Sequence, residues 1–188
     1  MSISFKSANA DLFQSGAEAW VNPVNCVGVM GKGLALVFRQ RFPDNLRQYQ
    51  QACLERGLRP GHFLAVENHG AGPAFILNLA TKDRWQDPSE LEWVAQGARR
   101  MRIWAEEKGV AWVACPALGS GEGRLPWAQV KAELIIAFGN SPVNFEVYEP
   151  RGISPKALLE TQDRGMQSLP SSVALQTVVP RKISFRSR

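Results

Sequence analysis

Residues 19–35 decide the fold and read Ala19-Trp20-Val21-Asn22-Pro23-Val24-Asn25-Cys26-Val27-Gly28-Val29-Met30-Gly31-Lys32-Gly33-Leu34-Ala35. The first part is a short, mostly apolar run of the kind that forms a strand covered on both faces. The second part is a glycine-rich loop that leads straight into a predicted helix over 33–41. Because backbone N–H groups at a helix N-terminus bind anions, the stretch predicts a loop that cradles a phosphate group.

A second glycine-rich loop reads Pro116-Ala117-Leu118-Gly119-Ser120-Gly121-Glu122-Gly123-Arg124 and follows another apolar run. Open α/β sheets bind ligands at the carboxyl ends of their strands, where both loops are expected. Two such loops at one sheet edge favour a nucleotide that carries phosphates. Neither loop ends in Gly-Lys-Ser/Thr or fits Gly-x-Gly-x-x-Gly with a following acidic residue, which disfavours a kinase and an ordinary dehydrogenase.

Short apolar runs alternate with helical patterns over residues 1–150, which predicts an α/β layered domain. A chain of 188 residues with 45% apolar composition can bury the core of such a domain without disulfides. Strands are expected at 3–6, 19–24, 63–67, 75–79, 112–115 and 145–148. Helices are expected at 33–41, 44–56, 89–108 and 127–138, with Ser89 as the N-cap of the third, Gly109 as its stop and Gly57 as the stop of the second.

Residues 151–188 form a separate basic tail in this interpretation. The chain holds 22 Lys and Arg against 17 Asp and Glu, and the whole excess of five falls in the tail, because residues 1–150 hold 15 of each kind. Such a tail suits nucleic acid or an acidic protein partner. The alternative is a disordered end that only keeps the protein soluble.

Neither a metal site nor a disulfide framework is expected. Cys26, Cys53 and Cys115 are widely spaced, and only His62 and His69 are available as imidazole ligands. Cys115 lies in an apolar run, which predicts a buried thiol. No apolar stretch approaches the roughly 18 residues of a membrane helix, and the N-terminus lacks a signal pattern, so a soluble, cytoplasmic protein without membrane partners is expected.

The order and spacing of these motifs over residues 1–150 resemble the macrodomain family, and within it the DarG type, the DNA ADP-ribosyl glycohydrolases that act as antitoxins to DarT toxins. The likeness to the DarG type rests on residues 29–35 and on Asn78-Leu79-Ala80-Thr81-Lys82-Asp83-Arg84-Trp85. The resemblance implies a three-layer α/β/α fold with a six-stranded mixed sheet. It also implies that ADP-ribose is the ligand or product and that no cofactor is needed.

The resemblance assigns a set of ADP-ribose contacts to this sequence. Asp11 would accept from the adenine amino group, although the family usually has glycine where Ala10 stands, and Asn25 would hold the distal ribose. Glu122 stands where many macrodomains have an apolar residue, so its carboxylate either points away from the diphosphate or acts as a base. The expected contacts are Asp11, Asn22, Asn25, Gly31, Lys32, Gly33, Leu34, Ser120, Gly121, Glu122 and Gly123.

Lys82 is the catalytic residue that the resemblance implies. A neutral Lys82 can attack the ring-opened distal ribose and form a Schiff base, whereas a protonated Lys82 can stabilise charge on the departing thymine. A related protein-directed glycohydrolase adds an aspartate where this chain has Gly123, and its absence favours the DNA-directed type. Without the resemblance, a solvated lysine in a Thr-Lys-Asp turn is the alternative.

Arg84 and Trp85 are candidate DNA contacts, because a cation and an aromatic ring bind the backbone and bases of a single strand. For Trp85 the alternative is a half-buried anchor of its loop. The leading hypothesis is a hydrolase that removes ADP-ribose from thymidine bases in single-stranded DNA and so reverses a DarT-type toxin. The competing hypotheses are a non-catalytic ADP-ribose-binding module and an interaction protein that neutralises a toxin through its tail.

Overall fold

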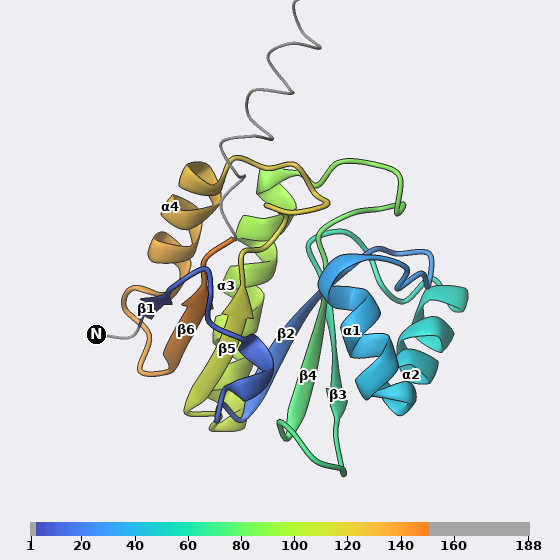
Figure 1. Cartoon of the computed structure of the whole chain (residues 1–188), viewed down its shortest axis with the longest axis horizontal. Coiled ribbons are helices and arrows are strands. Elements are labelled where there is room, and N and C mark those ends of the chain that lie inside the picture. The colour runs from blue at the N-terminus through green and yellow to red at the C-terminus, as the bar shows by residue number, and fades with distance from the viewer. Residues whose placement is uncertain (1–2, 151–188) are drawn as a thin grey trace, which may run out of the picture. The chain divides into compact units, whose positions relative to one another are not determined.

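A computed structural model describes residues 3–150 of the chain, so the predicted basic tail at 151–188 lies outside the described residues. The elements follow one another in the alternating order expected of an α/β domain (Figure 1). They are β1 (Ile3–Lys6), the 3-10 helix η1 (Leu12–Gln14), β2 (Ala19–Val24), α1 (Gly33–Arg41), α2 (Pro43–Leu54), β3 (Phe63–Glu67), β4 (Phe75–Ala80), α3 (Leu91–Lys108), β5 (Trp112–Pro116), α4 (Trp127–Phe138) and β6 (Asn144–Tyr148).

The six strands form one mixed sheet in the order β1-β6-β5-β2-β4-β3. Five strands run parallel, and only β3, at one edge, is antiparallel to its neighbour β4. The predicted six-stranded mixed sheet is therefore confirmed. Since β4, β2 and β5 are parallel neighbours at its centre, the loops that follow these three strands leave the sheet from the same edge.

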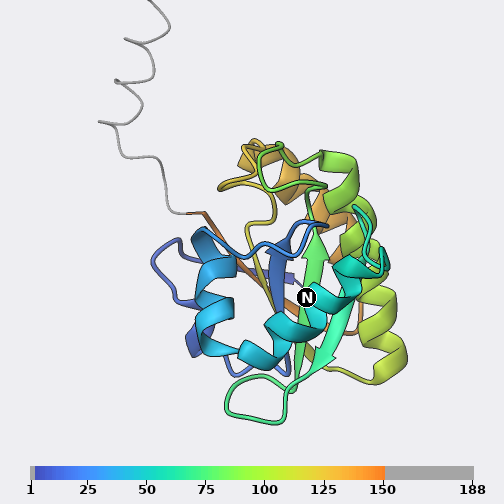
Figure 2. The same ribbon diagram turned by 90° about the vertical axis from the view of Figure 1, so that its right-hand side faces the viewer.

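Helices cover both faces of the sheet, as the three-layer prediction requires. Figure 2 shows α1 on one side of the sheet and α3 on the other, with α2 in front of the strands. The larger part of the core lies between the sheet and α3 and α4, where Val94, Met101 and Leu134 pack against Val21 and Leu77 with no exposed surface. Each such side chain stabilises the fold by about 2 kcal/mol through the hydrophobic effect.

On the opposite face, aromatic side chains dominate the core. Phe38 of α1 is fully buried, and Trp20 of β2 packs against Phe42 with ring centroids 6.1 Å apart. Beside this cluster, Tyr49 of α2 packs against Met30 from the glycine-rich loop. The loop after β2 is thus anchored in the core by one of its own side chains.

Two predicted helix ends are corrected by the structure. Ser89 is not the N-cap of α3, because Glu90 takes that position and makes no side-chain capping bond. The backbone of Ser89 instead pairs with the carbonyl of Gly123, with an N–O distance of 3.0 Å. Helix α2 ends at Leu54, before the predicted stop at Gly57, because Arg56 already adopts the left-handed backbone conformation with φ of 53°. The stop at Gly109 is confirmed.

Candidate active site

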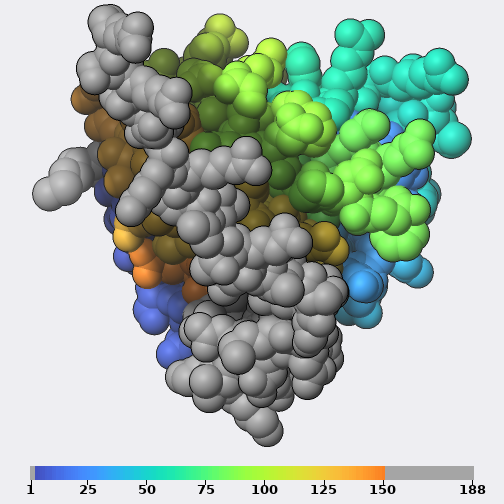
Figure 3. Space-filling view, turned by 90° about the horizontal axis from the view of Figure 1, so that it is seen from above, coloured from blue at the N-terminus to red at the C-terminus, as the bar shows by residue number. Residues whose placement is uncertain are grey.

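Three loops meet at the carboxyl ends of β2, β4 and β5, and each receives a name here. The first loop is residues 25–32 after β2, the lysine loop is residues 81–90 after β4, and the second loop is residues 117–126 after β5. Figure 3 looks down on this edge and shows the green atoms of the lysine loop beside the blue atoms of the first loop and α1, with turquoise atoms of α2 next to them. Both predicted glycine-rich loops therefore lie at one edge, as expected.

Asn25 holds the first loop in shape. Its side-chain oxygen accepts from the N–H groups of Val27 at 3.0 Å and Val29 at 3.3 Å, and its amide donates to the Val29 carbonyl at 2.7 Å. The hydroxyl of Tyr49 lies 2.9 Å from the main-chain oxygen of Asn25 and 3.0 Å from its side-chain oxygen. The amide of Asn25 is thus engaged within the protein, and its predicted contact with the distal ribose stays a prediction.

Asn22 belongs to a buried row of three asparagines. Its amide donates to Asn78 at 2.9 Å and lies 3.7 Å from the sulfur of Met30. Asn78 and Asn45 exchange hydrogen bonds at 2.6 and 3.2 Å, which joins β4 to α2. Because Asn22 is completely buried, its place supports a role in fixing Met30 and the first loop. Its direct contact with ADP-ribose stays a prediction.

The lysine loop is bonded to the first loop by its backbone. The N–H of Cys26 donates to the carbonyl of Asp83 at 2.8 Å, and the thiol of Cys26 lies 3.5 Å from the carbonyl of Lys82. One residue earlier, the N–H of Thr81 donates to the carbonyl of Val24 at 3.0 Å. These hydrogen bonds continue the pairing of β2 with β4 beyond the sheet and fix the position of the Lys82 backbone.

Lys82 reaches from its loop to the second loop, where its ammonium group donates to the main-chain carbonyl of Glu122 at 2.5 Å. Partial burial lowers the pKa of Lys82 below its usual value; the charge of Glu122 opposes this shift, and the charges of Arg124 and Lys32 add to it. Asp87 also raises the pKa. The structure thus brings the predicted residues Lys82, Lys32 and Glu122 together, and sequence reasoning had not placed Arg124 or Asp87 among them.

The second loop is held by its own backbone. The N–H of Leu125 donates to the carbonyl of Gly119 at 2.9 Å, and that of Arg124 to the carbonyl of Gly121 at 3.0 Å. Gly119 and Gly123 are buried, whereas Gly121 and Glu122 are exposed, and Ser120 lies between these extremes.

The side chain of Glu122 crosses toward the first loop. Its Cγ lies 3.7 Å from the position that a Cβ on Gly33 would occupy. Gly31 and Lys32 of the first loop are exposed, and Leu34 is partly buried. This contact does not test the two alternatives for Glu122, a carboxylate that points away from the diphosphate or one that acts as a base, and both stay predictions.

Asp11 lies at the start of η1, where its side chain accepts from the N–H of Phe13 at 3.0 Å. It lines a hollow of about 290 Å³ together with Tyr148 and Glu146. The carboxylate of Glu146 is buried and pairs with Lys6 at 2.6 Å. The exposed carboxylate of Asp11 is free to meet an adenine amino group, and this contact stays a prediction.

Arg84 and Trp85 are both exposed, and 52% of the Trp85 surface is accessible. This half-exposed position agrees with both interpretations of Trp85, so its contact with DNA stays a prediction. Within residues 3–150 no group of His, Cys, Asp and Glu side chains has the arrangement of a metal site, and Cys115 is fully buried as predicted. No helix in this range is long and apolar enough to span a membrane.

Comparison with known sequences identifies the fold. Residues 21–134 match the profile of the Macro domain. The chain belongs to the macrodomain family. The DNA ADP-ribosyl glycohydrolase of Mycobacterium tuberculosis (strain ATCC 25618 / H37Rv) is 39% identical over 146 residues, which cover 77% of this chain and 42% of that protein. The protein of the same name from Thermus aquaticus is 42% identical over 143 residues, covering 74% of this chain and 39% of its own length.

Comparison of structures agrees with the family assignment. The macrodomain of Mycobacterium tuberculosis DarG superposes with a TM-score of 0.75 at 37% sequence identity, covering 79% of this chain and 99% of that one. The resemblance to DarG-type macrodomains is therefore confirmed. This macrodomain chain spans about two fifths of the length of the curated relatives it matches.

Three residues that support the site were not singled out by sequence reasoning: Asn45, Tyr49 and Asn78. Asn78 offered a signal, because it is a polar residue inside the apolar run 75–80, where an unpaired amide would be costly. Asn45 and Tyr49 lie in the amphipathic pattern of α2 and look like ordinary helix positions. Their partners come from distant segments, so only the folded structure reveals them.

Proposed function

We propose that this macrodomain hydrolyses the bond between ADP-ribose and thymidine bases in single-stranded DNA and thereby reverses a DarT-type toxin. The proposal draws on the similarity to proteins named DNA ADP-ribosyl glycohydrolase and to a DarG macrodomain. The observation that carries it is the position of Lys82, whose side chain extends from the lysine loop to the second loop. Nearby cations there lower the pKa of Lys82 and nearby carboxylates raise it.

The surroundings of Lys82 suit either chemical role. As a neutral amine it attacks C1 of the ring-opened distal ribose, and the bond from C1 to the thymine nitrogen breaks as thymine takes up a proton. Water then hydrolyses the resulting Schiff base to release ADP-ribose and the free lysine. As a cation it stabilises negative charge on the departing thymine. Burial lowers the pKa of Lys82, as does the charge of Arg124, and both increase the neutral fraction that the first route requires.

The remaining contacts follow from the arrangement of the loops. The exposed glycines of the first loop and the N-terminus of α1 provide backbone N–H groups for a diphosphate. The second loop lies opposite, within reach of the same phosphates. This scheme uses no cofactor. The proposed partner in the cell is a DarT-type toxin, and residues 151–188 are the candidate region for contacting it.

The test is to incubate the protein with a single-stranded oligonucleotide that carries ADP-ribose on one thymidine and to follow free ADP-ribose by mass spectrometry. Lys82→Ala is expected to slow release by at least about a hundredfold, the contribution typical of a positioned catalytic group, while ADP-ribose binding is retained. Lys108→Ala, in the last turn of α3, is the matched control and should release ADP-ribose like the parent. Binding of ADP-ribose without turnover by the parent would favour the non-catalytic binding module.

The two routes differ in whether Lys82 becomes covalently attached. Reduction with cyanoborohydride during turnover traps a Schiff base as a stable amine. A mass increase on the peptide that contains Lys82 is expected for the nucleophilic route and is absent from Lys82→Arg. Turnover without a trapped adduct would assign the electrostatic role instead.

A further inference from the structure

A groove of about 620 Å³ lies beside the first loop, outside the set of predicted ADP-ribose contacts. Its walls come from the first loop, through Cys26 and Val27, and from the end of α2, through Cys53 and Leu54, with Arg56 just beyond the helix. The amide of Gln50 donates to the carbonyl of Gly28 at 3.3 Å and so links the two walls.

The walls of the groove carry unusual exposed apolar surface. Leu54 is 79% exposed and Val27 is 48% exposed, although leucine and valine are usually buried in the core of a protein. Bases of single-stranded nucleic acid present flat, largely apolar faces, and contact with exposed apolar side chains removes these faces from water. The exposed apolar surface of the groove therefore suits an unstacked base.

Arg56 supplies a cation at the mouth of the groove. It is one of only two non-glycine residues with a left-handed backbone among residues 3–150, and Arg124 beside Lys82 is the other. A side chain is unfavourable in this conformation, and the next residue, Gly57, would adopt it without cost. The chain nevertheless has an arginine in this conformation, and Arg56 is one of the residues that line the groove.

Arg56 is exposed, so its charge is accessible to a ligand in the groove. Over residues 3–150, no ion pair involves Arg56. The neighbouring carboxylate, Glu55, accepts a hydrogen bond from Gln51 at 2.5 Å. An unpaired guanidinium next to an apolar surface matches a phosphate next to a base.

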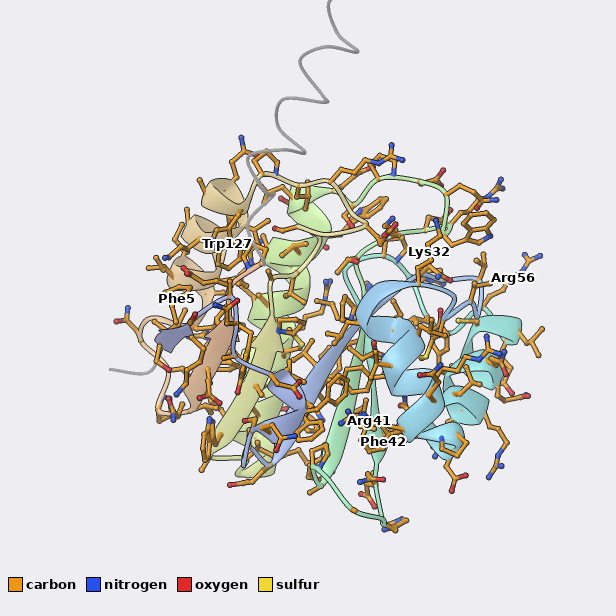
Figure 4. All side chains as sticks on the ribbon, in the orientation of Figure 1. Phe5, Lys32, Arg41, Phe42, Arg56 and Trp127 are labelled. Carbon is orange, nitrogen blue, oxygen red and sulfur yellow. The ribbon has the colours of Figure 1, made fainter. Side chains whose placement is uncertain are left out.

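The groove adjoins the proposed reaction centre. Cys26, in its wall, is bonded through its N–H to Asp83 and through its thiol to the carbonyl of Lys82. Trp85, half exposed, follows two residues after Asp83. Figure 4 shows Lys32 near the start of α1 and Arg56 to the right of it, whereas Arg41 and Phe42 lie at the other end of α1.

We infer that this groove binds the nucleotide next to the ADP-ribosylated thymidine, with the base against Val27 and Leu54 and a phosphate on Arg56. The inference rests on the proposed function. A thymidine within a strand is linked by phosphates to its neighbours, so a strand that presents its modified base to Lys82 continues across the adjoining surface. The groove gives that strand both an apolar and a cationic contact.

The experiment compares two substrates: a thymidine nucleoside that carries ADP-ribose, and a short single-stranded oligonucleotide that carries it at an internal thymidine. Arg56→Glu is expected to raise KM for the oligonucleotide about tenfold, since it turns a phosphate contact into a repulsion, and to leave kcat and the nucleoside KM unchanged. Arg47→Glu is the matched control, because Arg47 lies on α2 outside the groove and is exposed. It should behave like the parent.

Two further measurements sharpen the result. Arg56→Ala should reduce the slope of log(kcat/KM) against log salt for the oligonucleotide by about 0.7, the contribution of one phosphate on a single strand. Leu54→Glu should raise the oligonucleotide KM as Arg56→Glu does, and its high exposure leaves folding unaffected. Equal effects of Arg56→Glu on both substrates, or equal behaviour of Arg56→Glu and Arg47→Glu, would overturn the inference. So would equal KM values of the parent for both substrates, which would leave the groove to a protein partner.

Failure of the proposed function is recognised separately. If the parent hydrolyses neither substrate, that function is wrong, and the groove is judged by fluorescence anisotropy of an unmodified labelled single strand. Binding that is weakened by Arg56→Glu and Leu54→Glu but not by Arg47→Glu would support the DNA groove by itself. In that case, absence of binding, or equal binding by all four proteins, would contradict it.

Discussion

The two glycine-rich loops have similar compositions but are stabilised in different ways. The first loop is held by side chains, chiefly Asn25 and Tyr49, and leaves Gly31 and Gly33 exposed at the start of α1. The second loop is held by backbone bonds and buries Gly123. Glycine thus keeps the surface open for a ligand in one loop and permits close packing in the other. Composition alone does not distinguish these two uses.

The largest effect on stability is expected from a substitution that adds a side chain at the buried Gly123 of the second loop. A Cβ on Gly123 would lie 2.3 Å from both the carbonyl oxygen of Gly119 and the hydroxyl of Ser89. Neither neighbour is the end of a long flexible side chain, so the loop must shift. Gly123→Ala should lower the free energy of unfolding by about 3 kcal/mol, the upper part of the range for overpacked sites, as measured by urea denaturation.

Gly121→Ala is the control within the same loop. Nothing lies within 4 Å of a Cβ at this position, so its unfolding curve should match that of the parent. Equal destabilisation by both variants would mean that the loop tolerates no side chain anywhere, and the distinction between buried and exposed glycines would fail.

The second largest effect is expected from removing the side chain that shapes the first loop. Asn25→Ala deletes three hydrogen bonds to Val27 and Val29 and removes the side-chain acceptor of the buried Tyr49 hydroxyl. The expected loss is about 2 kcal/mol in the free energy of unfolding, together with weaker binding of ADP-ribose in calorimetry. Tyr49→Phe removes a donor to the same residue and should cost about half as much.

The balance between these two losses tests how the first loop is built. If Tyr49→Phe were neutral while Asn25→Ala remained costly, the loop would be held from within and not by α2. If Asn25→Ala weakened ADP-ribose binding without changing stability, Asn25 would act on the ligand alone, as the family resemblance predicts.

Most of the fold could be predicted from the sequence because strand and helix signals were local. All six strands were expected within a residue or two of where they lie, and Gly109 ends α3 as its position indicated. One of the two corrected helix ends arose where a backbone partner lies far away in sequence. Serine is a residue type that favours the N-cap position, but the N–H of Ser89 donates a hydrogen bond to the carbonyl of Gly123, 34 residues later.

The residues of the candidate site could largely be predicted from the sequence, whereas the hydrogen bonds that join them could not. Lys82 was singled out through the family resemblance, and the convergence of the two glycine-rich loops was expected because both follow strands of an open α/β sheet; that the lysine loop joins them is seen only in the structure. The buried row that joins Asn22, Asn78 and Asn45 was missed, since its members come from β2, β4 and α2. The left-handed backbone of Arg56 was missed because the adjacent Gly57 is the residue that usually takes that conformation.

The smallest expected effect is a shift in the pH profile of kcat/KM when the contact between the lysine loop and the second loop is changed. The direction of this shift distinguishes the two proposed roles of Lys82. The carboxylate of Glu122 raises the pKa of Lys82, so Glu122→Gln should lower that pKa further. If the neutral amine reacts, the acidic limb of the kcat/KM profile moves to lower pH and turnover near neutrality increases. If the ammonium form reacts, the alkaline limb moves to lower pH and turnover on that limb falls. Either change should be less than about tenfold, because both groups are partly solvated.

Asp87→Asn provides the matched comparison for this profile. Asp87 raises the pKa of Lys82 as well, but less than Glu122 does, so its variant should shift the same limb in the same direction by a smaller amount. An unchanged profile in both variants would show that neither carboxylate acts on Lys82 during turnover. A shift in Glu122→Gln alone would place the effect in the second loop, where Lys82 already donates to the Glu122 carbonyl.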